Sequence, residues 1–122
     1  MSNILLIEDM KSVQTSIATI LTNAGYSVTT ADNGQLGIET FRTREFDLVI
    51  TDIMMPELDG SEVLVELANK PGRPPLIAIS AGGGGINATE ALRFARKIAD
   101  EVLEKPFARN TLLDVVEQLI SK

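Results

Sequence analysis

The sequence predicts an α/β fold in which five parallel strands form a doubly wound sheet with helices on both faces. Short apolar runs, typical of strands buried inside a protein, alternate with longer segments whose apolar residues recur at helical spacing. Glycines, prolines and an Asp-Asn-Gly sequence separate these segments where connections are expected. Strands and helices that alternate in this way along a chain are typical of a parallel sheet.

The first strand is expected at Ile4–Ile7 and runs directly into Glu8 and Asp9. A helix follows, because apolar residues then recur along one side of a helical pattern. These residues are Val13, Ile17, Ile20, Leu21 and Ala24. Gly25 comes just past the pattern and supplies the left-handed conformation with which many helices end.

A half-buried strand is expected at Tyr26–Thr30, and the turn residues 32–34 then lead into a second helix. The apolar residues of this helix are Leu36, Ile38 and Phe41. Gly37 lies among them and weakens the helix by about 1 kcal/mol relative to alanine. The central strand is expected at Phe46–Thr51 and runs into Asp52.

The third helix follows the loop 54–60, and its apolar residues are Val63, Leu64 and Leu67. Residues 71–75 contain three prolines, and a helix interior does not tolerate them. The chain is therefore expected to break there. The fourth strand follows at Leu76–Ile79 and runs into Ser80.

A fourth helix begins after a glycine run, where Asn87 and Glu90 have the spacing of a capping box. Its apolar residues are Ala91, Phe94, Ala95 and Ile98. The fifth strand is expected at Glu101–Glu104 and is followed by Lys105 and Pro106. The last helix comes after this proline, with a buried stripe formed by Leu112, Val115, Val116, Leu119 and Ile120.

Length and composition limit the possible functions. The 122 residues suffice for one domain, residues 1–122, with a sizeable core. The chain has no cysteine and no histidine, which excludes a disulfide scaffold, a thiol nucleophile and the commonest general base. A formal net charge of -6 argues against nucleic acid and anionic lipid and favours protein partners. No segment approaches the ~20 apolar residues of a membrane span, and we expect a cytoplasmic protein.

Polar side chains follow four of the predicted strands: Glu8 and Asp9, then Asp52, then Ser80, and finally Lys105. The carboxyl ends of parallel strands lie along one edge of a sheet, where open α/β sheets bind ligands. A strand order of 2-1-3-4-5 places the first and third strands side by side and so brings the three acids together. Close carboxylates repel one another by roughly 4 kcal/mol per pair, and Mg²⁺ would relieve this repulsion. The sequence therefore predicts a site for a divalent cation and a phosphoryl group.

Each of these residues also has a purely structural interpretation. Glu8 and Asp9 could cap the following helix, and Asp52 could begin a turn. Ser80 could be a plain buried hydroxyl, and Lys105 an ordinary exposed lysine. The residues taken singly leave both interpretations open.

Four segments together resemble the receiver domains of two-component response regulators, and the resemblance covers nearly the whole chain. The segments are residues 4–9, 47–60, 79–81 and 103–107. Each alone is weakly specific, but their order and spacing together are highly specific. The resemblance implies a flavodoxin-like three-layer sandwich with the strand order 2-1-3-4-5.

The resemblance also implies a magnesium site and a phosphorylation site. Asp52 would be the phosphoacceptor. Glu8 and Asp9 would form the acidic pair that holds Mg²⁺, together with Asp52 and the backbone carbonyl of Met54. The cation would be the one cofactor.

Lys105 would pair with the phosphoryl group from a strand end fixed by a cis peptide before Pro106, and Ser80 would be the switch hydroxyl. Because the chain has no histidine, the phosphoryl group must come from a histidine kinase, a histidine phosphotransferase or a small acyl phosphate. Such a domain is not a dedicated enzyme, although it assists its own phosphorylation and slow dephosphorylation. It would signal to a downstream protein through its last two helices and the strand between them. A stand-alone regulator and a receiver segment of a longer protein fit the sequence equally well.

The chain departs from the family pattern at three places. Glu8 replaces the commoner aspartate and adds a methylene group to the pocket. Val102 stands where the family usually has an aromatic ring that moves with the switch hydroxyl, and a stiff β-branched side chain has no comparable swing. The run Gly82–Gly85 is either a flexible connector or a loop that becomes ordered on phosphorylation.

Other classes of protein fit the sequence less well. A magnesium-dependent aspartyl phosphatase of the haloacid dehalogenase type needs a second acid two residues after its nucleophile, where this chain has Met54. The glycine run lacks the spacing of a nucleotide-binding loop. A pseudo-receiver that signals by binding alone, without phosphate, stays a second hypothesis. Val102 favours it, whereas the acids, Ser80 and Lys105 oppose it.

Overall fold

A computed structural model describes residues 2–53, 60–80 and 93–121. Its strands form one five-stranded parallel sheet in the order β2-β1-β3-β4-β5, which confirms the predicted topology. The strands are β1 (Asn3–Ile7), β2 (Ser27–Ala31), β3 (Leu48–Asp52), β4 (Leu76–Ser80) and β5 (Glu101–Glu104). The helices are α1 (Lys11–Asn23), α2 (Gly34–Thr43), α3 (Gly60–Ala68) and α5 (Arg109–Ile120), and residues 93–98 are also helical. Within these ranges, no helix is long and apolar enough to cross a lipid bilayer.

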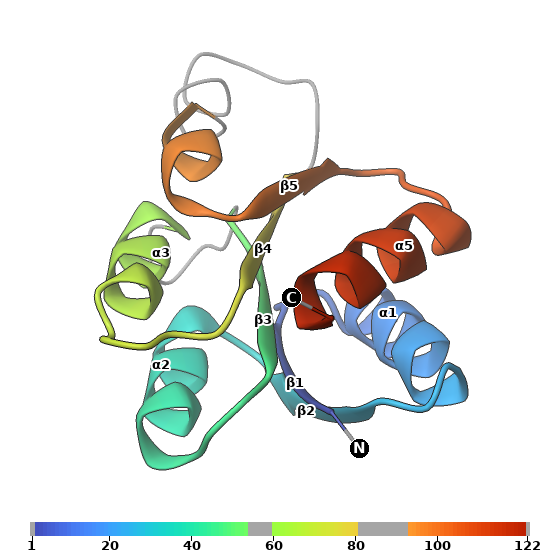
Figure 1. The fold of residues 1–122 in the computed structure, drawn as a ribbon, viewed down its shortest axis with the longest axis horizontal. Coiled ribbons are helices and arrows are strands. Elements are labelled where there is room, and N and C mark those ends of the chain that lie inside the picture. Colours follow the sequence, from blue (N-terminus) through green and yellow to red (C-terminus); the bar gives the residue numbers. More distant parts are fainter. Residues whose placement is uncertain (1, 54–59, 81–92, 122) are drawn as a thin grey trace.

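Helices cover both faces of the sheet, which gives the predicted three-layer sandwich (Figure 1). α1 and α5 lie on one face, and α2, α3 and residues 93–98 lie on the other (Figure 1). The buried core on the first face consists of Ile4, Leu6, Ile17, Leu21, Leu48, Ile50, Ile77, Ile79, Leu103, Leu112 and Val116. The core on the second face consists of Leu5, Ile7, Ala31, Phe41, Val49, Ile53, Val63, Leu64, Leu67, Leu76, Ala78 and Ala95. Successive residues of a central strand thus pack on opposite faces, as the pleat requires.

Two turn signals in the sequence act as predicted. Gly25 follows α1 with a φ of 99°, in the left-handed region, and its N–H donates to the Thr22 carbonyl at 3.0 Å. Asn33 is the N-cap of α2, and its side-chain oxygen accepts the N–H of Leu36 at 2.9 Å. The capping box predicted at residues 87–90 lies outside the described residues.

The register of the central strands positions the candidate site. β1 lies between β2 and β3, and Ile7 is in register with Thr51 of β3. Glu8 therefore leaves the end of β1 next to Asp52, the last residue of β3. Because β1 and β3 are parallel and end at the same edge of the sheet, residues far apart in sequence meet there.

Candidate functional site

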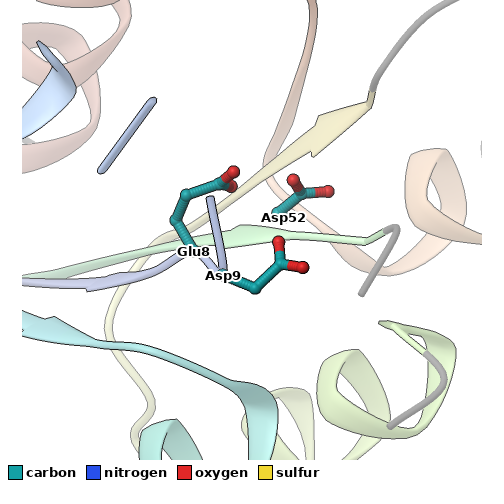
Figure 2. Close-up of side chains that lie close together, drawn as sticks. All are labelled: Glu8, Asp9 and Asp52. Atoms are coloured by element: carbon teal, nitrogen blue, oxygen red, sulfur yellow. The ribbon is translucent and has the colours of Figure 1, made fainter. Parts of the chain in front are cut away.

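Three acidic side chains meet at the carboxyl edge of the sheet, where β1 and β3 lie side by side (Figure 2). One carboxylate oxygen of each residue, Glu8, Asp9 and Asp52, lies within 4.8 Å of those of the other two. Glu8 is fully buried, Asp52 is 3% exposed, and Asp9 is half-buried. Asp9 is therefore the member of the cluster that solvent reaches most easily.

Lys105 joins this acidic cluster from the end of β5. Its Nζ lies 3.0 Å from Oδ2 of Asp52 and 3.3 Å from Oε1 of Glu8. The Lys105–Pro106 peptide is cis, as expected, and the Lys105 N–H donates to the Ser80 carbonyl at 2.7 Å. The lysine side chain is only 20% exposed, so its interpretation as an ordinary exposed lysine is wrong.

Burial and crowding change the protonation of this cluster. Burial, followed by a hydrogen bond and the charge of Asp52, raises the pKa of Glu8 to about 8, although Lys105 partly opposes the change. Burial works against the charge on Lys105, but hydrogen bonds and charges from Asp52 and Glu8 outweigh it and raise the lysine pKa. Without a cation, Glu8 thus holds a proton at neutral pH while Lys105 stays charged.

The donor set fits a hard divalent cation. Glu8 Oε2 is buried and has no hydrogen-bond partner among the described residues, which is costly for a carboxyl oxygen unless a ligand completes it. The cluster offers carboxylate oxygens only, and Mg²⁺ prefers oxygen ligands from one or two carboxylates together with water and phosphate. Glu8, Asp9 and Asp52 are the residues that would hold it. The carbonyl of Met54 lies outside the described residues.

The structure also locates the residues expected to act in switching. Ser80 is 3% exposed at the end of β4, the strand beside β3. Val102 is half-buried in β5 and packs against the core on the face covered by α2, α3 and residues 93–98. The run Gly82–Gly85 lies outside the described residues, so its two interpretations stay untested.

The interpretation of Glu8 and Asp9 as helix caps is wrong. Met10 is the N-cap of α1, and no side-chain capping bond occurs there within the described part of the chain. Glu8 instead extends the β1 ladder, because its N–H donates to the Ala31 carbonyl at 3.0 Å. The acids are therefore available to the cluster.

Sequence reasoning missed one polar residue behind the acids. Gln14 of α1 is 5% exposed, and its Nε2 donates to the Glu8 carbonyl and to Asp32 Oδ1, both at 3.0 Å. The sequence did contain a signal, because Gln14 shares the buried face of α1 with Ile17 and Leu21. A polar residue in an apolar stripe is expected to have a buried partner.

The model of the response regulator receiver domain family matches residues 4–117 of this chain. The chain belongs to that family. The receiver domain is 32% identical over 120 residues to the probable transcriptional regulator ycf27 of Cyanidium caldarium, covering 98% of this chain and 47% of that protein. It spans about half the length of the curated relatives it matches.

Solved structures agree with this assignment. The receiver domain of the sensor histidine kinase PA1611 from Pseudomonas aeruginosa PAO1 superposes with a TM-score of 0.86 at 28% identity, covering 99% of this chain and 98% of that one. That protein has a magnesium ion coordinated in its active-site cleft. The chemotaxis response regulator CheY4 of Vibrio cholerae gives a TM-score of 0.85 at 24% identity, covering 98% of each chain, and shares the fold.

Proposed function

We propose that this receiver domain accepts one phosphoryl group on Asp52 with the help of Mg²⁺ and thereby switches a protein-binding surface. One observation supports this above all. The buried Asp52 carboxylate lies 3.0 Å from Lys105 Nζ and within ligand distance of two further acids. A carboxylate with a lysine ammonium group on one side and a pair of acids that could bind a metal ion on the other is suited to phosphoryl transfer.

In the proposed reaction, a carboxylate oxygen of Asp52 attacks the phosphorus atom of the donor. A P–O bond forms as the donor's bond to phosphorus breaks, and the electron pair of that bond leaves with the donor. Lys105 then donates to the phosphoryl oxygens from its position beside Asp52. When bound, Mg²⁺ supplies further positive charge next to these oxygens.

The donor must be another molecule, because the chain has no histidine that could form a phosphohistidine. A histidine kinase or histidine phosphotransferase is the protein donor we propose, and a small acyl phosphate is the chemical one. The domain assists the transfer and is not a dedicated enzyme. Membership of the receiver family supports this class of partner. The output surface we propose comprises residues 93–98, β5 and α5.

A pseudo-receiver without phosphorylation is the second candidate, and Val102 favours it. This β-branched side chain is packed against the core in β5 and has few rotamers available. Such a residue would couple phosphorylation to the output surface weakly, even if Asp52 accepts phosphate. The experiment for Asp52 therefore has to detect the phosphoryl group itself rather than its effect on a partner.

Incubation with acetyl phosphate and Mg²⁺ should add one phosphoryl group to the protein, measured by intact mass spectrometry. Asp52→Asn should abolish the addition, because an amide oxygen is a poor nucleophile. Asp114→Asn, a matched change on the exposed side of α5, should leave it intact. Unchanged labelling of the Asp52 variant would defeat the assignment, and an unlabelled native protein would favour the pseudo-receiver.

A further inference from the structure

We propose that Gln14 is a positioning residue that fixes the geometry of Glu8 and Asp9 and so strengthens binding of the divalent cation. This inference rests on the proposed function, because it assumes that the acidic pair binds Mg²⁺. Within the described part of the chain, the hydrogen bonds of Gln14 go to the Glu8 carbonyl, Asp32 and Lys11 and not to a carboxylate of the acidic cluster. Gln14 acts on the backbone that presents these acids.

The contact with the Glu8 carbonyl is the central observation. Gln14 Nε2 donates to this carbonyl at 3.0 Å in a buried environment. The carbonyl belongs to the peptide unit that joins Glu8 to Asp9, and this unit is planar. Fixing one oxygen of the plane therefore limits the directions in which both acidic side chains leave the backbone.

The other side of Glu8 is fixed as well. Its N–H donates to the Ala31 carbonyl of β2 at 3.0 Å. Both polar groups of the Glu8 backbone are thus bonded, one to a neighbouring strand and one to α1. The side chain is then held toward Lys105, whose Nζ lies 3.3 Å away.

Gln14 is itself held in place by Asp32, which follows β2. The amide nitrogen donates to Asp32 Oδ1 at 3.0 Å, and Lys11 Nζ reaches the same oxygen at 2.8 Å. Lys11 Nζ also lies 3.4 Å from Gln14 Oε1. Hydrogen bonds from Lys11 and Gln14 lower the pKa of Asp32, so this carboxylate stays a charged acceptor for the amide. The glutamine side chain has little freedom to turn away from Glu8.

Groups that orient metal ligands typically change metal affinity by about 10–100-fold when removed. Gln14 orients the ligands through one backbone carbonyl, so we expect the lower end of this range. Gln14→Met keeps the length of the side chain and removes both donors. Gln14→Arg puts guanidinium N–H donors in place of the amide donors that bond to the Glu8 carbonyl and Asp32. Gln118→Met makes the matched change at an exposed position of α5.

The test is a Mg²⁺ titration followed by backbone NMR shifts, together with the thermal midpoint of each metal-free variant. Gln14→Met should weaken Mg²⁺ binding about tenfold, Gln14→Arg should recover most of the affinity, and Gln118→Met should match the native protein. A lower thermal midpoint with unchanged Mg²⁺ affinity would show a structural role only and overturn the inference. A native protein that does not bind Mg²⁺ would instead overturn the proposed function and this inference together.

A second variant keeps the test decisive if Gln14→Met does not fold. Asp32→Ala acts at an exposed position and releases the amide of Gln14 without emptying the buried site. Asp114→Ala makes the same change of charge on α5, away from these contacts. Weaker Mg²⁺ binding in Asp32→Ala than in Asp114→Ala supports the role of Gln14, and equal binding overturns it.

Discussion

At the residue scale, Glu8 is the group whose charge is most strongly affected by burial. Its carboxyl group is fully buried beside Asp52, and one of its oxygens has no partner within the described residues. Burial of an ionised carboxylate costs free energy unless a proton or a cation compensates it. In the folded protein without metal, a proton on Glu8 removes this cost at neutral pH, since the Glu8 pKa rises to about 8. A bound cation would compensate the charge of the ionised carboxylate, so that no proton is needed.

The raised pKa of Glu8 predicts how the stability of the metal-free protein depends on pH. The Glu8 pKa is about 8 in the folded state and 4.5 without the fold, so between these values the folded state binds more protons. The contribution of Glu8 to stability is therefore present below pH 4.5 and is lost as pH rises toward 8. Glu8→Gln, which resembles the protonated acid, should be roughly 1–3 kcal/mol more stable than the native protein at pH 8 and similar to it at pH 4. Urea denaturation at both pH values measures this.

Magnesium provides the control for this pH prediction. At pH 8, Mg²⁺ should stabilise the native protein, because the cation takes the place of the lost proton. It should stabilise Glu8→Gln less, because an amide is a poorer ligand for the cation. Equal stability of the two proteins at pH 4 and pH 8 without metal would contradict the raised pKa.

At the scale of single elements, the contact between α2 and β1 explains a glycine inside a helix. Gly37 is buried in α2. A Cβ atom built on it would overlap Cδ1 of Ile7 and lie 2.6 Å from Cγ1 of the same residue. The sequence showed only that Gly37 weakens the helix. The structure shows that glycine lets the helix pack closely on the strand that leads to Glu8.

Gly37→Ala should therefore destabilise the protein, although alanine is the better helix former. Alanine gains up to about 1 kcal/mol in helix propensity, but overpacking against a buried strand costs about 1–3 kcal/mol. We expect a net loss of about 1 kcal/mol in the free energy of unfolding, measured by urea denaturation.

A double-mutant cycle with Ile7→Val identifies the cause of this loss. Valine lacks the Cδ1 atom that the new methyl group would overlap. The double variant should lose less stability than the sum of the single variants, with a coupling of at least about 0.5 kcal/mol. Additive losses would place the cost of Gly37→Ala elsewhere in α2.

At the scale of the whole molecule, local patterns predicted which segments form strands and helices, whereas the resemblance to receiver domains implied the order of the strands in the sheet. β1, β3 and β4 are almost wholly buried, so their apolar runs are unbroken, and Gly25 and Asn33 mark helix ends. The meeting of Glu8 and Asp52 then followed from the strand order alone.

Other parts of the site have no pattern that a sequence displays. The hydrogen bond from Gln14 to the Glu8 carbonyl depends on how α1 packs against β1, and a backbone acceptor leaves no trace in residue type. The complete burial of Glu8 is a property of the folded molecule in the same way. Residue types thus identified the groups that meet at this edge of the sheet, and packing determines how they are held and protonated.

Lys105 links three strands of the sheet. From the end of β5, its Nζ contacts Glu8, which follows β1, and Asp52, which ends β3. Lys105→Ala should keep the fold, since the side chain lies at the end of β5 and is not part of either hydrophobic core cluster. The variant should lose the response that reaches β5 and α5 when beryllium fluoride and Mg²⁺ occupy the site. Backbone NMR shifts should then change only beside Asp52, whereas the native protein should show changes through β4, β5 and α5. Lys70→Ala, at an exposed position after α3, is the matched control and should respond as the native protein does. A Lys105 variant with the native pattern of shifts would exclude this lysine from the switch.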